Sequence, residues 1–266
     1  MVASLLALVV ATFENSPPLQ LHGGARAYFE SAYLSSSGRV SYTEPVAEQY
    51  GYLSLEHEDY GSLSTDFWLG SALNKQTDSV HRRAFYCYEG TVTYGNSVNV
   101  SDGVNLSGWG GIIWDWLGGY KTKVHTPIGW ISEFKLSNAY LTPYVNALGF
   151  FTNQSWTRIR FGVNHRFVFF ESLAVTPFLE ATWGDAERYR QNYGGETDGD
   201  FCGGALMFTS FGLIAEWTFY DNFYLWGRYR QYVLLDHKAR DLVSDSDSVT
   251  AKDSMPIFGL GVGFRF

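Results

Sequence analysis

Cysteine is almost absent from the sequence, which contains only Cys87 and Cys202 among its 266 residues. A disulfide scaffold needs several cysteines and a metal site needs clustered ligands, so we expect neither of these, and no cofactor. The strand count given below separates the two cysteines by about six strands, whereas a disulfide requires Cα atoms within about 7 Å. We therefore predict that Cys87 and Cys202 are unpaired.

Charged residues and long apolar runs are also scarce. Charged residues make up 17% of the sequence, and the mean hydropathy is -0.13. A helical membrane bundle would need several apolar runs of about 20 residues, so this class of protein is excluded. The net charge of -8 and the pI of 5.2 argue against a nucleic-acid partner.

The one uninterrupted apolar run spans residues 2–13. It is too short to cross a bilayer as a helix, but it is typical of a secretory signal. Val9 and Ala11 are small enough for the positions before a cleavage site, so the sequence predicts a signal peptide over residues 1–11. No lysine or arginine precedes the run, and a buried first strand or helix remains the alternative.

Aromatic residues and glycines are abundant, at 18% of the sequence and 28 residues respectively. The final segment shows how they are arranged, because apolar residues and glycines alternate up to the last residue. Such a period of two predicts a β-strand with an apolar face and a second face of glycines and an arginine. An edge strand of a soluble sandwich is the alternative. The apolar parity consists of Phe258, Leu260, Val262, Phe264 and Phe266.

Similar segments recur along the chain, separated alternately by tight turns and long polar stretches. This pattern predicts a single all-β domain over residues 12–266, a closed antiparallel up-and-down transmembrane barrel of about 12 strands. The stretch 94–106 is a turn, a bulged strand extension or both, so ten or fourteen strands are the alternatives. We expect strands over residues 23–34, 49–58, 63–72, 82–94, 104–116, 128–136, 141–151, 156–168, 174–184, 203–219, 223–235 and 256–266.

Parity also assigns the polar faces of these strands to the barrel interior. The basic pore-lining candidates are Arg26, Arg158, Arg160, Arg166, Arg228 and Arg230. The acidic pore-lining candidates are Glu56, Asp66, Glu89, Asp115, Glu133 and Glu180. Tyr224 and Tyr232 are candidates for aromatic contacts with a solute.

The arginines gather on the late strands and the first one, and most of the carboxylates on strands two to six. In a closed barrel, these groups would occupy roughly opposite walls. Replacing Arg228 and Arg230 with alanine should then shift permeation toward cations, because residues in the lumen tune selectivity. Alternatively, Glu180 and Glu216 neutralise the arginines, and side chains fill the barrel.

Alternating strands, aromatic residues near strand ends and the terminal phenylalanine resemble the outer-membrane β-barrels of Gram-negative bacteria, in particular small porin-like channels. The resemblance implies a bacterial outer-membrane location, contact with outer-membrane lipid, and passive diffusion of small polar solutes or ions. It also implies that Val262, Phe264 and Phe266 form a signal read by the barrel-assembly machinery. Whether the barrel forms a homo-oligomer stays open.

An enzymatic function is not expected from the sequence. The six histidines are scattered over different segments, and none lies beside a nucleophile in a recognisable motif. We therefore predict no catalytic residues. The alternatives to a channel are an adhesin or structural anchor that acts through the long loops, or a lipid-modifying barrel enzyme.

Overall fold

The computed structural model describes residues 19–34, 40–42, 44–73, 86–118, 128–151, 156–185, 205–236, 240 and 253–266. The predicted signal peptide and Cys202 lie outside these ranges. Within them, no helix is long and apolar enough to cross a membrane. The strands are β1 (Gln20–Glu30), β2 (Tyr33–Leu34), β3 (Val40–Tyr42), β4 (Val46–His57), β5 (Gly61–Ala72), β6 (Tyr86–Ser101), β7 (Val104–Gly118), β8 (Ile128–Ser137), β9 (Thr142–Phe150), β10 (Trp156–Asn164), β11 (Phe167–Phe169), β12 (Leu173–Gly184), β13 (Ala205–Tyr220), β14 (Phe223–Leu234) and β15 (Ser254–Arg265).

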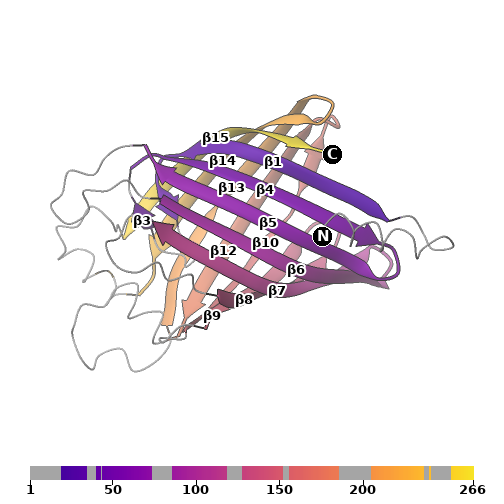
Figure 1. Cartoon of the computed structure of the whole chain (residues 1–266), viewed down its shortest axis with the longest axis horizontal. Coiled ribbons are helices and arrows are strands. Elements are labelled where there is room, and N and C mark those ends of the chain that lie inside the picture. The colour runs from indigo at the N-terminus through magenta and orange to yellow at the C-terminus, as the bar shows by residue number, and fades with distance from the viewer. Residues whose placement is uncertain are drawn as a thin grey trace, which may run out of the picture.

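The long strands form one closed antiparallel barrel (Figure 1). Each pairs with its neighbour in sequence, β1 pairs with β15, and β10 pairs with β12. Because β10 and β11 pair with successive parts of β12, they are two parts of one strand of the wall. The described part of the barrel therefore has 12 strands, which confirms the predicted fold class. The short strands β2 and β3 pair only with each other.

Both ends of the described chain lie at the same end of the barrel as the tight turns, which we call the short-turn end. There the backbone N–H of Arg265 donates to the carbonyl of Asn222 at 3.0 Å, and Gly23 and Phe266 exchange backbone hydrogen bonds. The turn after β13 contains Asp221 with φ of 35°. An up-and-down barrel with an even number of strands brings its ends together in this way.

The hairpin of β6 and β7 is longer than the sequence predicts. β6 continues to Ser101 and turns at Asp102 and Gly103, so the stretch 94–106 holds both a bulged extension and a turn. The expected end of this strand at residue 94 was wrong. β5 pairs with β6 only as far as Gly95, and β7 alone supports the extension beyond that point.

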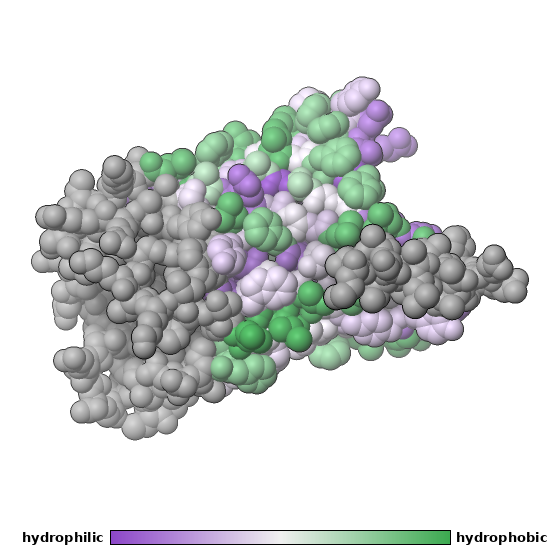
Figure 2. Space-filling model, viewed as in Figure 1, coloured by the Kyte–Doolittle hydropathy of each residue, from purple (hydrophilic) through white to green (hydrophobic). Residues whose placement is uncertain are grey.

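Apolar side chains cover the outer wall of the barrel. Figure 2 shows hydrophobic residues over much of the visible wall, and hydrophilic residues gathered at the tip of the short-turn end. Phe258, Leu260, Val262 and Phe266 are 56%, 67%, 54% and 54% exposed, and Phe264 packs against Phe266 with ring centroids 5.9 Å apart. The terminal strand therefore turns its apolar parity outward, as predicted, and the wall is suited to a bilayer.

Glycines on the inner face of β15 make room for aromatic rings from the neighbouring strands. A Cβ added at Gly259 would lie 2.8 Å from the ring of Trp226, and one at Gly263 would overlap the ring of Tyr224. At Gly261 it would collide with the carbonyl oxygen of Ala27 and the Cβ of Tyr28. A larger residue at Gly259 or Gly263 would therefore push these rings away from the wall. This close approach explains why glycine alternates with apolar residues at the end of the sequence.

Candidate channel interior

Strand register places the predicted charged candidates on the inner face of the barrel, except that Arg166 lies in the break between β10 and β11 and reaches the inner residue Glu216. The signs of these charges are unevenly distributed. The half formed by β10–β15 and β1 holds seven arginines and three glutamates, whereas β4–β8 hold six carboxylates and one lysine. The basic half contains Arg26, Arg158, Arg160, Arg166, Arg228, Arg230, Arg265, Glu30, Glu180 and Glu216. The acidic half contains Glu48, Glu56, Asp66, Glu89, Asp115, Glu133 and Lys135.

Glu180, on β12, is the centre of the larger buried ionic cluster. Its carboxylate lies 3.9 Å from Nη1 of Arg160 and 3.5 Å from Nη1 of Arg230. The hydroxyls of Ser210 and Tyr144 donate hydrogen bonds to it at 2.7 and 2.8 Å. The residue is only 4% exposed, so these partners replace the water that a charged carboxylate would otherwise bind.

A second cluster joins β14 to β1 and β4. Arg228 forms an ion pair with Glu30, whose side chain is 1% exposed. Nearby, Glu48 accepts hydrogen bonds from the hydroxyl of Tyr28 at 2.7 Å and from Nε1 of Trp68 at 2.8 Å. Each of these buried carboxylates therefore has a cationic or neutral donor.

The carboxylates of β5 and β8 are bound by neutral or cationic side chains of the same wall. Asp66 accepts hydrogen bonds from the hydroxyls of Tyr50 and, at 2.8 Å, Thr91. Glu133 lies 2.8 Å from Nζ of Lys135 and accepts a hydrogen bond from Trp109. The remaining acidic candidates are arranged differently: Glu56 lies 3.6 Å from Nε2 of His22 and is well exposed, and Glu89 and Asp115 are register partners on β6 and β7.

Two further groups of arginines lie at different positions along the basic half. Arg158 is 3% exposed and donates to Oδ1 of Asn146 at 2.6 Å. Arg166 and Arg265 each lie 3.6 Å from Glu216, and their side chains are 49% and 40% exposed. These two arginines are therefore the more hydrated members of the set.

Arg26 differs from the other inner arginines because aromatic rings surround it. Its guanidinium carbon lies 4.4 Å from the centroid of Trp226, 4.9 Å from that of Tyr28 and 5.6 Å from that of Tyr50. Cation–π contacts of this length are attractive, and Trp provides the strongest of them.

The two aromatic candidates are packed into the inner wall. Tyr232 is 1% exposed in an apolar cluster with Phe208 and Ile257, so its packing does not support contact with a solute. Tyr224 is 7% exposed beside Tyr28, and the guanidinium of Arg265 lies 5.1 Å from the centroid of its ring. In the structure, both side chains pack within the wall.

No protein-family model matches the sequence, and a search of curated proteins gives no match. Solved barrels are similar in structure. An outer membrane channel from Pseudomonas putida F1 is 12% identical with a TM-score of 0.54, and the match covers 96% of this chain and 98% of that one. This chain has the fold of a bacterial outer-membrane β-barrel. The apolar outer wall agrees with this fold, because the strands of such a barrel turn apolar side chains toward lipid.

Two other solved structures are matched with TM-scores under 0.5. The toluene transporter TodX of P. putida is 9% identical with a TM-score of 0.42, over 96% of this chain and 92% of that one. The outer membrane phospholipase A of Escherichia coli is 11% identical with a TM-score of 0.46, over 97% and 96%. Similarity at this level does not assign an activity to this outer-membrane barrel.

Several inner residues of the outer-membrane barrel were not among the sequence candidates. Glu30 forms an ion pair with Arg228, Glu48 accepts a hydrogen bond from Trp68, and Trp226 lies against the guanidinium of Arg26. The signal for the two carboxylates was present, because Glu30 shares the parity of Arg26. Glu48 shares the parity of Glu56, but the expected strand began one residue after it.

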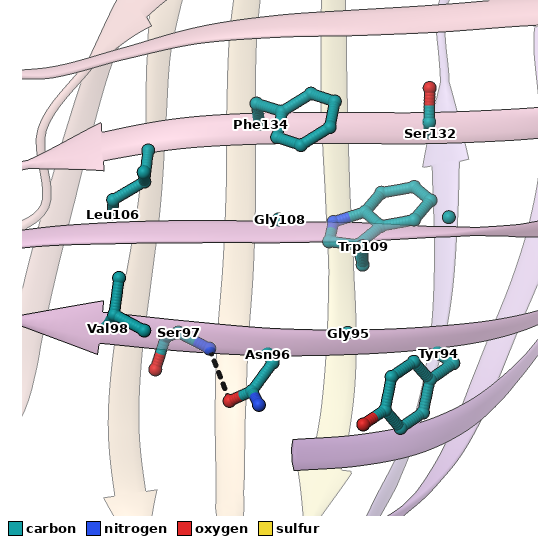
Figure 3. Close-up of a pocket in the computed structure, with 11 residues that line it drawn as sticks. Tyr94, Gly95, Asn96, Ser97, Val98, Leu106, Gly108, Trp109, Ser132 and Phe134 are labelled. Atoms are coloured by element: carbon teal, nitrogen blue, oxygen red, sulfur yellow. Dashed lines mark hydrogen bonds between the residues drawn. The ribbon is translucent and has the colours of Figure 1, made fainter. Parts of the chain in front are cut away.

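A groove of about 430 Å³ lies outside the barrel, over β6, β7 and β8 (Figure 3). Its walls include the outward side chains of Tyr94, Val98, Leu106 and Phe134, and its floor includes Gly108. These walls continue the apolar outer surface, so the groove faces the membrane and is separate from the interior. Among the described residues, no cluster of potential metal ligands is present.

Proposed function

We propose that the protein is a passive diffusion channel for small polar solutes or ions across the outer membrane. The observation that carries this proposal is the separation of charge inside a closed barrel, with an excess of arginine on one half and of carboxylate on the other. Opposite walls of opposite sign produce a transverse field, which orients a dipolar solute and raises the local concentration of counter-ions.

The buried clusters divide the roles of these residues. Arg160, Arg228 and Arg230 neutralise carboxylates within the wall, so they contribute less to the field than isolated charges would. The more exposed charged groups include Arg166 and Arg265. We propose that the pathway of the solute is lined by the hydrated charges and not by the centres of the buried clusters.

Single-channel recording in a planar bilayer tests the channel function. Refolded protein should give discrete conductance steps and a reversal potential in a salt gradient, whereas heat-unfolded protein from the same preparation should give neither. Absence of steps from a correctly folded barrel would contradict the proposal. It would favour a structural anchor whose interior is filled by the buried aromatic and ionic clusters described above.

We also propose that the last outward apolar residues of the chain form the signal read by the barrel-assembly machinery. Val262, Phe264 and Phe266 end the chain on the outer face, where a partner can reach them without entering the barrel. Phe266→Ala should lower the amount of folded protein in cell outer membranes while leaving refolding from urea unchanged. An equal loss in both assays would mean that the ring serves only stability.

A further inference from the structure

Arg26 has no acidic or hydrogen-bonding partner among the residues that the structure describes. Each of the other inner arginines lies within 4.0 Å of a carboxylate or donates to an amide oxygen. The register partners of Arg26 are Tyr50 and Gly263, neither of which carries a charge. Its positive charge is therefore not neutralised by direct contact within the wall.

The surrounding rings are held in place by carboxylates that do not reach Arg26 itself. The hydroxyl of Tyr28 donates to Glu48, and that of Tyr50 donates to Asp66. Trp226 is 1% exposed and packs against Tyr28 with ring centroids 4.9 Å apart. The rings of Tyr28 and Tyr50 are therefore fixed by these hydrogen bonds and that of Trp226 by packing, so the site is organised before any solute arrives.

This arrangement suits a carboxylate ligand. Aromatic rings interact with the face of a guanidinium, whereas its N–H groups point outward in the plane and match the two oxygens of a carboxylate. Of these rings, that of Tyr50 is half-buried and offers apolar surface to the carbon skeleton of an organic anion, whereas Trp226 and Tyr28 are buried and hold the guanidinium in place. A hydrated inorganic anion such as chloride would use the charge but neither the paired donors nor the rings.

The position of Arg26 in the barrel strengthens this assignment. β1 carries Arg26 and lies between β15, in the basic half, and β4, the first strand of the acidic half. A solute that crosses the barrel would meet the uncompensated cation at the border between the two walls. The charge and the transverse field would then act together on one end of a dipolar molecule.

From these observations, we infer that Arg26, with Trp226, Tyr28 and Tyr50, forms a binding site for small organic carboxylates inside the barrel. The inference rests on the proposed channel function for its physiological meaning. Binding itself can be measured without conduction.

Titration calorimetry with sodium benzoate on the refolded barrel tests the binding site directly. We expect saturable binding to the unaltered protein and a dissociation constant at least about ten-fold higher for Arg26→Gln, since a charge and paired donors are lost. Arg26→Lys keeps the positive charge but lacks the paired N–H donors of the planar guanidinium, so it should show an intermediate affinity. Sodium chloride at the same ionic strength is the control ligand, and circular dichroism checks that each variant is folded.

Current recordings separate the inference from the proposed function. In a conducting barrel, benzoate should reduce the chloride current with saturation, and Arg26→Gln should remove this saturation. Conductance without any effect of benzoate, or equal benzoate affinity for the unaltered protein and both variants, would overturn the site while leaving the channel intact. Benzoate binding without conductance would support the site and contradict the channel. If Arg26→Gln does not fold, the comparison of Arg26→Lys with the unaltered protein decides the matter.

Discussion

Replacing Glu180 with glutamine should reveal how dry the interior of the barrel is. The change removes the carboxylate that contacts both Arg160 and Arg230, whose side chains are 20% and 11% exposed. Removing one partner of a buried ion pair costs about 3–5 kcal/mol, because the other charge stays buried without compensation. Glutamine can still accept a hydrogen bond from Ser210 or Tyr144, so we expect the free energy of unfolding to fall by about 3 kcal/mol.

Glu216→Gln is the matched control for this experiment. Glu216 also contacts two arginines, at 3.6 Å each, but their side chains are 49% and 40% exposed. Solvent-exposed ion pairs contribute about 0–1 kcal/mol, so Glu216→Gln should lower the free energy of unfolding by at most about 1 kcal/mol. The two variants should therefore differ by about 2 kcal/mol. Urea unfolding of protein refolded into bilayers, followed by tryptophan fluorescence, gives both free energies of unfolding. Equal small losses would show that water reaches the Glu180 cluster and would refute this reasoning.

Three further predictions concern other parts of the barrel. Phe67→Arg, in the middle of the outward face of β5, should lower the free energy of unfolding in bilayers by about 2–4 kcal/mol. Its control, Phe170→Arg in the exposed turn, should lower it by at most about 1 kcal/mol. Equal effects would contradict the position of the apolar wall. Gly259→Leu should lower the free energy of unfolding by about 1–3 kcal/mol in the same assay, because the ring of Trp226 must move away from this residue. Mass spectrometry of unreduced peptides should find Cys87 and Cys202 unlinked, and a linked pair would disprove the expected separation.

The alternation of side chains made most of the strands and their faces predictable from the sequence. Side-chain direction in a strand follows from residue number alone, so the outward set of β15 and the inward arginines could be assigned without knowing any neighbour. Tight turns depend on local residues and were also recognisable. The sequence left the end of β6 open, with a bulged extension as one alternative. The residues beyond Gly95 keep the alternation, but β5 no longer pairs with them and β7 alone supports them.

Ion pairing was predicted only in part. The sequence left open that Glu180 and Glu216 neutralise the arginines, and in the structure each of them contacts two arginines. The pairing of Arg228 with Glu30 could not be predicted, since it depends on the register between strands that are far apart in the sequence. The sequence predicts that Arg228→Ala and Arg230→Ala together shift permeation toward cations. The structure pairs Arg228 with Glu30 and Arg230 with Glu180, both of which are buried. We therefore expect the double variant to lose stability as well, and its selectivity must be measured on protein shown to be folded.

Inner glycines explain how these distant side chains meet. Glu30 and Arg228 are both register partners of Gly259, one on each side of β15, so their side chains meet over a residue that has none.

The same geometry recurs around the wall. Tyr28 and Trp226 flank Gly261, and Tyr144 and Glu180 flank Gly162, and in each case the two side chains are in contact. A barrel of this size has inner side chains on every strand, and a larger residue at each of these positions would keep the flanking groups apart. The glycines of the terminal strand therefore have two roles: they admit the rings to the wall, and they bring Glu30 within reach of Arg228. Arg26 and Tyr224 likewise flank Gly263, which leaves Arg26 among aromatic rings and without a carboxylate. The exceptional position of this arginine thus follows from the same spacing that neutralises Arg228.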